Sequence, residues 1–376
     1  MSRPPAVGID AHYLARPEGN RTYVLNLLRG LAASPQAGLQ VWSYAFDPAE
    51  AAGLIPPGGA LAGHRLLAPR AAWARVGLGA PAVAWRDGLA VWHSSWVAPP
   101  WTPARVVVTI HDLLWLERPE LFGRLLRARL RALVPRAVRS AARVIAPSAA
   151  TEAALRAAFP RLGQRLVCVP LGVDLERFRP GPVAEDEERL RRLGLAGAGP
   201  FLLAVGRPDR RKGWETLFAA AAAARTAPRV VLAGPHARAE ARLRRAAQRA
   251  GLPRGRLAVV RSPGEEDLAA LYRAAGALCF PSRGEGVGLP ALEALATGTP
   301  ALLSDLPALR EAAGEAAIWL APGDAPAWAA VIDRTLADPE ARSRARELGP
   351  RQVAGRGLPA MAAATLEVYG AALAEG

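Results

Sequence analysis

The segment 277–300 constrains the fold more than any other part of the chain. Its apolar start, Ala277 to Phe280, predicts a buried strand, and Pro290 stands near the first position of a following helix. A loop with three glycines lies between them: Gly284, Gly286 and Gly288. Such a strand, loop and helix point backbone N–H groups and the positive end of the helix dipole at one place. This arrangement suits a phosphate or another anion.

Two carboxylates flank this loop. Glu285 lies within the loop and Glu293 on the first turn of the predicted helix, with seven residues between them. Glu285 can therefore reach a ligand held at the loop, and Glu293 can reach a part of that ligand lying along the helix. The alternative interpretation is that Glu285 is a solvated loop residue and that Glu293 only complements the helix dipole.

The length and composition of the chain are those of two domains. A chain of 376 residues with 51% hydrophobic content can form two full cores. It contains no run of 18 or more apolar residues and no basic-then-apolar leader, so we expect a cytoplasmic protein. Cys168 and Cys279 lie in apolar runs, which indicates core residues in a reducing compartment rather than a disulfide or a metal pair.

Short apolar runs alternate with segments of helical periodicity along the chain. This pattern predicts an α/β fold of doubly wound parallel sheets covered on both faces, with ligands beyond the carboxyl ends of the strands. The first half has predicted strands at Val7–Ile9, Gln40–Tyr44, Leu89–His93, Val106–Ile110 and Arg143–Ala146. The second half has them at Phe201–Val205, Val230–Ala233, Leu257–Val260, Ala277–Phe280, Ala301–Ser304 and Ala317–Leu320. Helices in that half start near Trp214, Ala237, Glu266, Pro290, Pro307 and Pro326.

Polar side chains stand at the predicted strand ends of the first half. His111 follows one strand in the run Thr-Ile-His-Asp, and His93 ends the preceding strand as a second candidate. Gly19-Asn20-Arg21 predicts a turn before a helix, in which Asn20 has a positive φ or caps the helix. The alternatives are histidines that only satisfy backbone groups and an ordinary strand-to-helix turn.

A basic loop follows the first predicted strand of the second half. It reads Gly-Arg-Pro-Asp-Arg-Arg-Lys-Gly from Gly206 to Gly213, and Lys212 is the only lysine among 48 basic residues. The guanidinium of Arg207 and the ammonium of Lys212 suit an oligophosphate, and a solvated basic turn is the alternative. No G-x-G-x-x-G or Walker A loop follows a first strand, which argues against a dinucleotide oxidoreductase and a P-loop kinase. The chain also lacks a D-x-D pair, so we expect no metal.

Together these motifs resemble retaining glycosyltransferases of family 4 (glycosyltransferase group 1), and in particular the mannosyltransferase B-like subfamily. The resemblance rests on the E-x7-E pair in its Gly-Leu-Pro setting, the Thr-Ile-His-Asp run, the G-R-x4-K-G loop and the interdomain pattern P-x-G-V-D-x-x-x-F-x-P from Pro170 to Pro180. It implies a GT-B fold, in which two Rossmann-like domains face each other across a cleft. Residues 1–170 form the acceptor-side domain, 171–180 the linker, 181–358 the nucleotide-sugar domain and 359–376 a helix that returns to the first domain.

The resemblance also implies a function. This is retaining transfer of a hexose, with mannose favoured, to a hydroxyl of a saccharide or lipid-linked acceptor in polysaccharide or glycolipid assembly. The donor is a nucleoside-diphosphate sugar, GDP-mannose first and UDP-glucose or another UDP-sugar second, without a cofactor or metal. The implied donor contacts are Arg207 and Lys212 on the diphosphate, Glu285 on sugar hydroxyls, Glu293 on the ribose and His111 near the reacting carbon, with Gly19, Asn20, Gly286, Val287, Gly288 and Leu289 around them. No carboxylate is placed as a nucleophile, so attack on the same face assisted by the leaving phosphate is expected.

The segment 122–143 interleaves arginine with leucine at helical spacing. It predicts a basic amphipathic helix interrupted before Pro135. Two interpretations stay open: contact with the anionic inner face of a membrane or a polyprenyl-diphosphate-linked acceptor, or a helix that packs one side on the sheet and solvates the other.

Two other functional classes also stay open. One is a sugar-nucleotide hydrolase or epimerase of the same fold, and the other is a non-catalytic basic binding protein. The net charge of +15 suits the second, but its arginines are spread along the chain without the interleaved aromatic residues of a nucleic-acid reader. We therefore expect no nucleic-acid partner.

Overall fold

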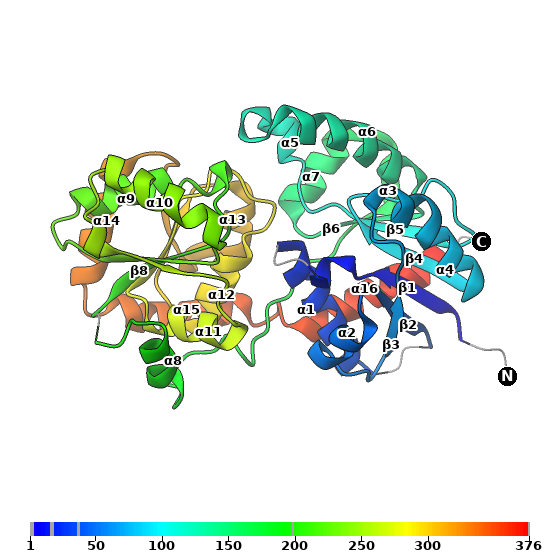
Figure 1. Ribbon diagram of the computed structural model, residues 1–376, viewed down its shortest axis with the longest axis horizontal. Helices are drawn as coiled ribbons and strands as arrows, with labels where there is room; N and C mark the ends of the chain where they lie inside the picture. Colours follow the sequence, from blue (N-terminus) through cyan, green and yellow to red (C-terminus); the bar gives the residue numbers. More distant parts are fainter. Residues whose placement is uncertain (1–3, 16–18, 36–37, 198, 375–376) are drawn as a thin grey trace. The chain divides into compact units, whose positions relative to one another are not determined.

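The computed structural model describes residues 4–15, 19–35, 38–197 and 199–374. The chain divides into two compact units (Figure 1). The first unit runs to Gly172 and includes the C-terminal segment from Arg356, and the second unit is Val173–Gly355. Each unit is a parallel sheet covered by helices, which confirms the predicted α/β class with two Rossmann-like domains.

The first unit is built on a seven-stranded sheet in the order β3-β2-β1-β4-β5-β6-β7, in which all neighbours are parallel. Its strands are β1 (Ala6–Asp10), β2 (Gln40–Ala45), β3 (Leu61–Leu66), β4 (Leu89–Ser95), β5 (Arg105–Thr109), β6 (Arg143–Ala146) and β7 (Leu166–Cys168). Its longer helices are α1 (Gly19–Ala33), α2 (Pro48–Leu54), α4 (Ala80–Arg86), α6 (Arg124–Ser140), α7 (Ala149–Ala158) and α16 (Leu358–Ala374). Short segments are η1 (His12–Ala15), α3 (Ala72–Ala74), η2 (Arg75–Gly79), α5 (Leu114–Glu117), η3 (Pro119–Leu121) and η4 (Pro160–Arg165).

The second unit is built on a six-stranded parallel sheet in the order β10-β9-β8-β11-β12-β13. Its strands are β8 (Phe201–Val205), β9 (Arg229–Ala233), β10 (Leu257–Val260), β11 (Ala277–Phe280), β12 (Ala301–Ser304) and β13 (Ile318–Leu320). Its helices are α8 (Asp186–Arg192), α9 (Trp214–Ala223), α10 (Ala237–Arg249), α11 (Glu265–Ala274), α12 (Leu289–Thr297), α13 (Pro307–Ala313), α14 (Ala325–Ala337) and α15 (Ala341–Val353), with the short segments η5 (Arg210–Lys212), η6 (Arg254–Arg256) and η7 (Gly314–Ala316).

The strand order of each sheet reverses at one place. In the first unit the chain adds β2 and β3 on one side of β1 and then returns to add β4 on the other side. In the second unit the same reversal falls between β8 and β11. Loops that leave adjacent strands in opposite directions open a crevice at the carboxyl ends, and open α/β sheets bind their ligands at this switch point.

Two local predictions in the first unit were wrong. Helix α1 begins at Gly19, so Asn20 lies in its first turn without a positive φ and does not form a turn before the helix. Helix α6 continues through Pro135 without interruption. The proline removes the backbone hydrogen bond to the carbonyl of Arg131, but this position is exposed, so water can replace the lost donor.

A buried chain of hydrogen bonds fastens α16 to the sheet of the first unit. His93 on β4 has its Nδ1 2.7 Å from the Tyr369 hydroxyl of α16 and its Nε2 2.8 Å from Thr109 Oγ1. The Tyr23 hydroxyl of α1 lies 2.8 Å from the same threonine oxygen. Burial, together with His111 nearby, lowers the pKa of His93 to about 3. The imidazole is therefore neutral, and both of its nitrogens are already bonded within the protein.

We expect Tyr369→Phe to lower the free energy of unfolding by about 1–3 kcal/mol, because the change leaves a buried nitrogen of His93 without its partner. Urea denaturation monitored by circular dichroism measures the difference. The same substitution in a His93→Phe background is the matched control and should cost much less, because no imidazole is left unpaired there. Equal losses in the two backgrounds would show that the hydrogen bond contributes nothing.

Candidate functional site

The switch point of the second sheet joins two of the residues that the sequence singles out. Lys212 lies in the loop after β8 and Glu285 in the loop after β11, and Lys212 Nζ is 2.8 Å from Glu285 Oε1. The two side chains are only 14% and 11% exposed. Ser282 Oγ donates a hydrogen bond of 2.7 Å to the same carboxylate oxygen. The charged pair is therefore fixed in place at the carboxyl edge of the sheet.

Close backbone packing positions this pair. Gly213, directly after Lys212, has a φ of 61°, and a Cβ there would lie 2.0 Å from the carbonyl oxygen of Pro281. The N–H of Arg283 donates to the carbonyl of Arg211 at 2.7 Å and joins the two loops. Lys212 Nζ also lies 4.6 Å from the centre of the Phe280 ring, a favourable cation–π distance. A side chain at position 213 would push the loops apart and separate the pair.

Helix α12 begins beside this pair. Its N-terminal residue Leu289 follows Gly288, which has a φ of 90°. This φ favours glycine, and a Cβ on Gly288 would in addition displace the Leu309 side chain, whose Cδ2 would lie 2.2 Å away. Within the described part of the chain no side chain caps this helix N-terminus. The segment from Gly286 to Leu289, predicted to contact the donor, therefore leads into a helix end suited to an anion.

Glu293 lies in the second turn of α12 rather than in the first, because the helix begins at Leu289. The residue is 5% exposed, and the Tyr272 hydroxyl donates a 2.7 Å hydrogen bond to its Oε2. Burial raises the pKa of Glu293 to about 8, although the hydrogen bond from Tyr272 acts in the opposite direction. At neutral pH this carboxyl group is therefore largely protonated and can both donate and accept a hydrogen bond.

Glu293 should make stability depend on pH. Its pKa of about 8 in the folded protein exceeds its ordinary value of 4.5, so its contribution is complete below pH 4.5 and is lost as the pH rises through 8. We expect the melting temperature to fall on the order of 5 °C more between pH 5 and pH 8 in the wild type than in Glu293→Gln. Calorimetry over this range measures the difference, and identical pH profiles would contradict the assignment.

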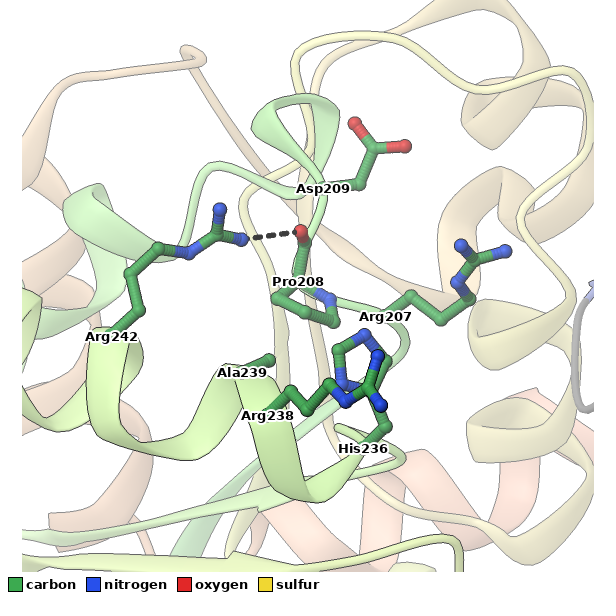
Figure 2. Close-up of a pocket in the computed structure, with 7 residues that line it drawn as sticks. All are labelled: Arg207, Pro208, Asp209, His236, Arg238, Ala239 and Arg242. Carbon is green, nitrogen blue, oxygen red and sulfur yellow. Dashed lines mark hydrogen bonds between the residues drawn. The ribbon is translucent and has the colours of Figure 1, made fainter.

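Arg207 lines a cavity of about 270 Å³ at the carboxyl ends of β8 and β9. The other lining residues are Pro208, Asp209, His236, Arg238, Ala239 and Arg242. Figure 2 shows His236 and Arg238, from the start of α10, lining the same cavity as Arg207. On the other side Arg242 donates a hydrogen bond of 2.9 Å to the carbonyl of Pro208. Three guanidinium groups against one carboxylate make this a positively charged cavity, which suits phosphate oxygens.

In the first unit, His111 directly follows Ile110 at the carboxyl edge of the sheet. Burial lowers the pKa of His111 to about 4, so its imidazole is neutral at pH 7. Among the described residues its buried Nε2 has no hydrogen-bond partner. The ring packs edge-on against Tyr23, with centroids 4.7 Å apart, and lies 5.6 Å from the ring of Trp96. A buried, unsatisfied nitrogen at this edge suits a hydroxyl group of a ligand.

Several residues that contact the predicted site residues were not predicted from the sequence. Ser282 stands three residues before Glu285, so its position in the same loop was the available signal. Tyr272, which donates a hydrogen bond to Glu293, lies 21 residues away in the chain, and no sequence motif links the two residues. Trp96 was not predicted as a site residue, because neither its backbone conformation nor its contact with His111 can be inferred from a single sequence.

Neither a metal-binding cluster nor a membrane-spanning helix occurs among the described residues. They contain no group of three or more His, Cys, Asp and Glu side chains that could hold a metal ion. No helix formed by these residues is long and apolar enough to cross a membrane. Neither Cys168 nor Cys279 forms a disulfide within the described part of the chain.

Comparison with known proteins identifies both halves of the chain. Residues 17–177 match the family Glycosyltransferase Family 4, and residues 185–352 match Glycosyl transferases group 1. A D-inositol 3-phosphate glycosyltransferase from Frankia alni is 34% identical over 68% of this chain and 64% of its own length. The chain spans about half the length of two other curated relatives with the same name.

Solved structures show the same fold. Sucrose-phosphate synthase from Thermosynechococcus elongatus has a TM-score of 0.79 at 25% identity over the full length of both chains. HepE from Anabaena, solved with UDP and glucose, has a TM-score of 0.76 at 16% identity over 97% of this chain and 99% of its own. The protein is therefore built from a Glycosyltransferase Family 4 domain and a group 1 glycosyl transferase domain and has the GT-B fold.

Proposed function

We propose that this protein transfers a hexose from a nucleoside-diphosphate sugar to a hydroxyl group of an acceptor. The observation that carries the proposal is the Lys212–Glu285 pair at the switch point of the second sheet, next to the start of α12. A cation and a helix N-terminus suit a diphosphate, whereas a carboxylate suits sugar hydroxyls. The family membership of both halves of the chain supports the same activity.

Each residue of the second unit has a separate role in this proposal. Arg207 and Lys212 hold the diphosphate and stabilise the negative charge that grows as it departs. Glu285 accepts hydrogen bonds from the transferred sugar, and Glu293 bonds the ribose hydroxyls. The segment from Gly286 to Leu289 supplies backbone N–H groups to the phosphates. In the first unit, His111 contacts the sugar near the reacting carbon, while Gly19 and Asn20 face the donor or acceptor.

We infer that the configuration at the transferred carbon is retained. Glu285 is poorly placed as a nucleophile, because its Oε1 is already bound by Lys212 and Ser282. The acceptor hydroxyl then attacks from the face that the diphosphate leaves, and its proton passes to a departing phosphate oxygen. The carbon–oxygen bond to the diphosphate breaks as the new glycosidic bond forms. A product with the inverted anomer would contradict this step.

The proposed donor and the proposed acceptor rest on different observations. The resemblance to mannosyltransferases favours GDP-mannose, with a UDP-sugar second, and a saccharide or polyprenyl-diphosphate-linked acceptor. The relatives named D-inositol 3-phosphate glycosyltransferases add a phosphorylated cyclitol as a candidate acceptor. Each of these acceptors offers a hydroxyl group that can receive the sugar. The lipid-linked acceptor and the cyclitol also carry an anionic phosphate group.

A nucleotide panel tests the donor site. The melting temperature of the purified protein is measured with GDP, UDP, ADP and their sugars, with and without EDTA, because a ligand that binds only the folded state must raise it. We expect GDP or UDP to stabilise the protein equally well in EDTA, and the response identifies the base. A protein that no nucleotide stabilises, or that responds only with a divalent cation, would contradict the proposed site.

We further propose that α6 places the protein on the inner, anionic face of a membrane. Its C-terminal half packs through Val134, Ala137 and Val138, whereas Leu125 and Leu126 are 86% and 50% exposed. The segment 121–143 contains seven arginines and no acidic residue. Exposed leucines among arginines suit a surface with apolar chains below negative headgroups.

Sedimentation with lipid vesicles tests this surface. We expect binding to vesicles with phosphatidylglycerol, little binding to pure phosphatidylcholine, and release by high salt. Leu125→Gln with Leu126→Gln should weaken binding to the anionic vesicles. The matched control is Leu348→Gln, an exposed leucine on α15 of the other unit. Equal binding by all variants, or no binding to anionic vesicles, contradicts the membrane contact.

A further inference from the structure

The switch point of the first sheet has a different chemical character from that of the second. Between β1 and β4 it presents Asn20, which follows β1, and Trp96, which follows β4, with His111 beyond β5 alongside. These three groups are neutral, and the charged Asp10 at the end of β1 is buried and paired with His12 and Arg75. The second sheet instead presents Lys212 and Glu285 at its switch point. A ligand held by the first switch point should therefore offer an apolar face and hydroxyl groups rather than a diphosphate.

Trp96 occupies an unusual backbone conformation at this place. Its φ is 67°, in the left-handed region that bulky side chains rarely adopt. Neighbouring hydrogen bonds hold it there: the Trp96 N–H donates to the Thr109 carbonyl at 3.0 Å, and the Val97 N–H donates to the Ser95 carbonyl at 2.8 Å. Ser94 Oγ also donates to the Val97 carbonyl at 2.8 Å. A strained conformation that the surroundings enforce is characteristic of functional sites.

The strain directs the indole between two residues of the candidate site. Trp96 Nε1 donates to Asn20 Oδ1 at 3.5 Å, and its ring lies 5.6 Å from the His111 ring at an angle of 50°. The unpartnered Nε2 of His111 therefore lies close to an aromatic surface. The carboxylate of β1, that of Asp10, is buried and bonded to His12, and Asp112, which follows His111, accepts a hydrogen bond from the Leu114 N–H. The combination of an aromatic surface and neutral polar groups is the one that sugar rings require, because one face carries C–H groups and the edge carries hydroxyls.

We propose that Trp96 is the stacking surface for a pyranose or cyclitol ring of the acceptor, and that it determines acceptor specificity. The strand order β1-β4-β5 places Trp96 between Asn20 and His111 along the edge of the sheet. This inference rests on the proposed function, in which His111 contacts the transferred sugar. The ring next to that sugar is the one that receives it.

Binding of two ring probes tests the inference without a donor. Methyl α-D-mannopyranoside and D-inositol 3-phosphate are added to the full-length protein, and saturation-transfer NMR reports which ring protons contact it. We expect saturation of the C–H protons on one face of at least one probe. The affinity should fall roughly tenfold in Trp96→Ala, about the loss of one stacking contact, and recover in Trp96→Phe. The control Trp101→Ala removes a tryptophan that is 61% exposed and should bind like the wild type.

Trp96→Gly separates stacking from a purely structural role. Glycine accepts a positive φ without strain, so this variant should melt no lower than Trp96→Ala and still lose the ring probes. Unchanged probe affinity in Trp96→Ala, or absence of binding by the wild type, overturns the inference. A higher KM for the nucleotide sugar in place of weaker probe binding also overturns it, because Trp96 would then contact the donor. Stabilisation of the same samples by GDP or UDP reports separately on the proposed donor site, so the two failures are distinguishable.

Discussion

Lys212→Ala should abolish stabilisation by a nucleoside diphosphate and reduce sugar transfer at least about a hundredfold. The change removes the ammonium group 2.8 Å from Glu285 and leaves that carboxylate without its cation. The diphosphate then loses an attractive charge and meets an uncompensated negative one. Steady-state kinetics and thermal shift with the responsive nucleotide measure the two effects.

Arg210→Ala is the matched control, because Arg210 is exposed on the same short turn as Lys212. It removes an equal charge without touching Glu285 and should leave nucleotide binding within about twofold of the wild type, as expected for an exposed charge. If both variants lose binding equally, net charge rather than the Lys212–Glu285 pair attracts the nucleotide. Lys212→Arg should recover only part of the activity, because a guanidinium does not reproduce a compact ammonium at this close contact.

Glu285→Gln should impair sugar transfer while leaving nucleotide binding intact. It removes the carboxylate that is proposed to hold sugar hydroxyls but leaves Lys212 to bind the diphosphate. We expect transfer to fall about a hundredfold or more, while the nucleoside diphosphate alone still raises the melting temperature. Kinetics with the sugar nucleotide and thermal shift without the sugar measure these outcomes.

Ser282→Ala is the informative companion to Glu285→Gln. It removes only the 2.7 Å hydrogen bond that orients the carboxylate and keeps both charges. Its effect on transfer should be clearly smaller than that of Glu285→Gln. Full activity in Glu285→Gln would contradict the role assigned to this carboxylate, and loss of nucleotide binding in the same variant would place the residue on the diphosphate.

The strands that sequence patterns located best are buried on both faces. β6, β8, β11 and β12 have the predicted bounds, because their short apolar runs contrast with the loops around them. The half-buried edge strand β10 also has the predicted bounds. β3 (Leu61–Leu66) was not predicted as a strand, and β7 (Leu166–Cys168) was seen only as an apolar run around a cysteine. These two strands form the edges of the first sheet. Polar residues His64 and Arg65 interrupt the apolar pattern of β3, and β7 is only three residues long.

Helix α15 (Ala341–Val353) was also missed. It is rich in arginine and buries only Gly349 and Val353, so its apolar stripe is too narrow to reveal a helical period.

The candidate site could be predicted in its parts but not in its contacts. The motifs placed Lys212 and Glu285 in loops after two strands, and they are 73 residues apart in the chain. Only the strand order, with β8 beside β11, makes these loops neighbours. The proposed role of Trp96 depends on its positive φ, which cannot be predicted from the sequence because tryptophan rarely adopts this conformation. Sequence patterns therefore give the chemistry of the residues, while topology decides which of them act together.

Direct detection of sugar transfer tests the central proposal most sharply. The protein is incubated with the GDP- or UDP-sugar that stabilises it and with methyl α-D-mannopyranoside, D-inositol 3-phosphate or a polyprenyl-diphosphate-linked saccharide, and the products are followed by NMR. The proposal predicts a new glycosidic bond with the anomeric configuration of the donor, in EDTA, and none in Lys212→Ala. Release of free sugar at the same rate with and without every acceptor would identify a hydrolase and contradict it.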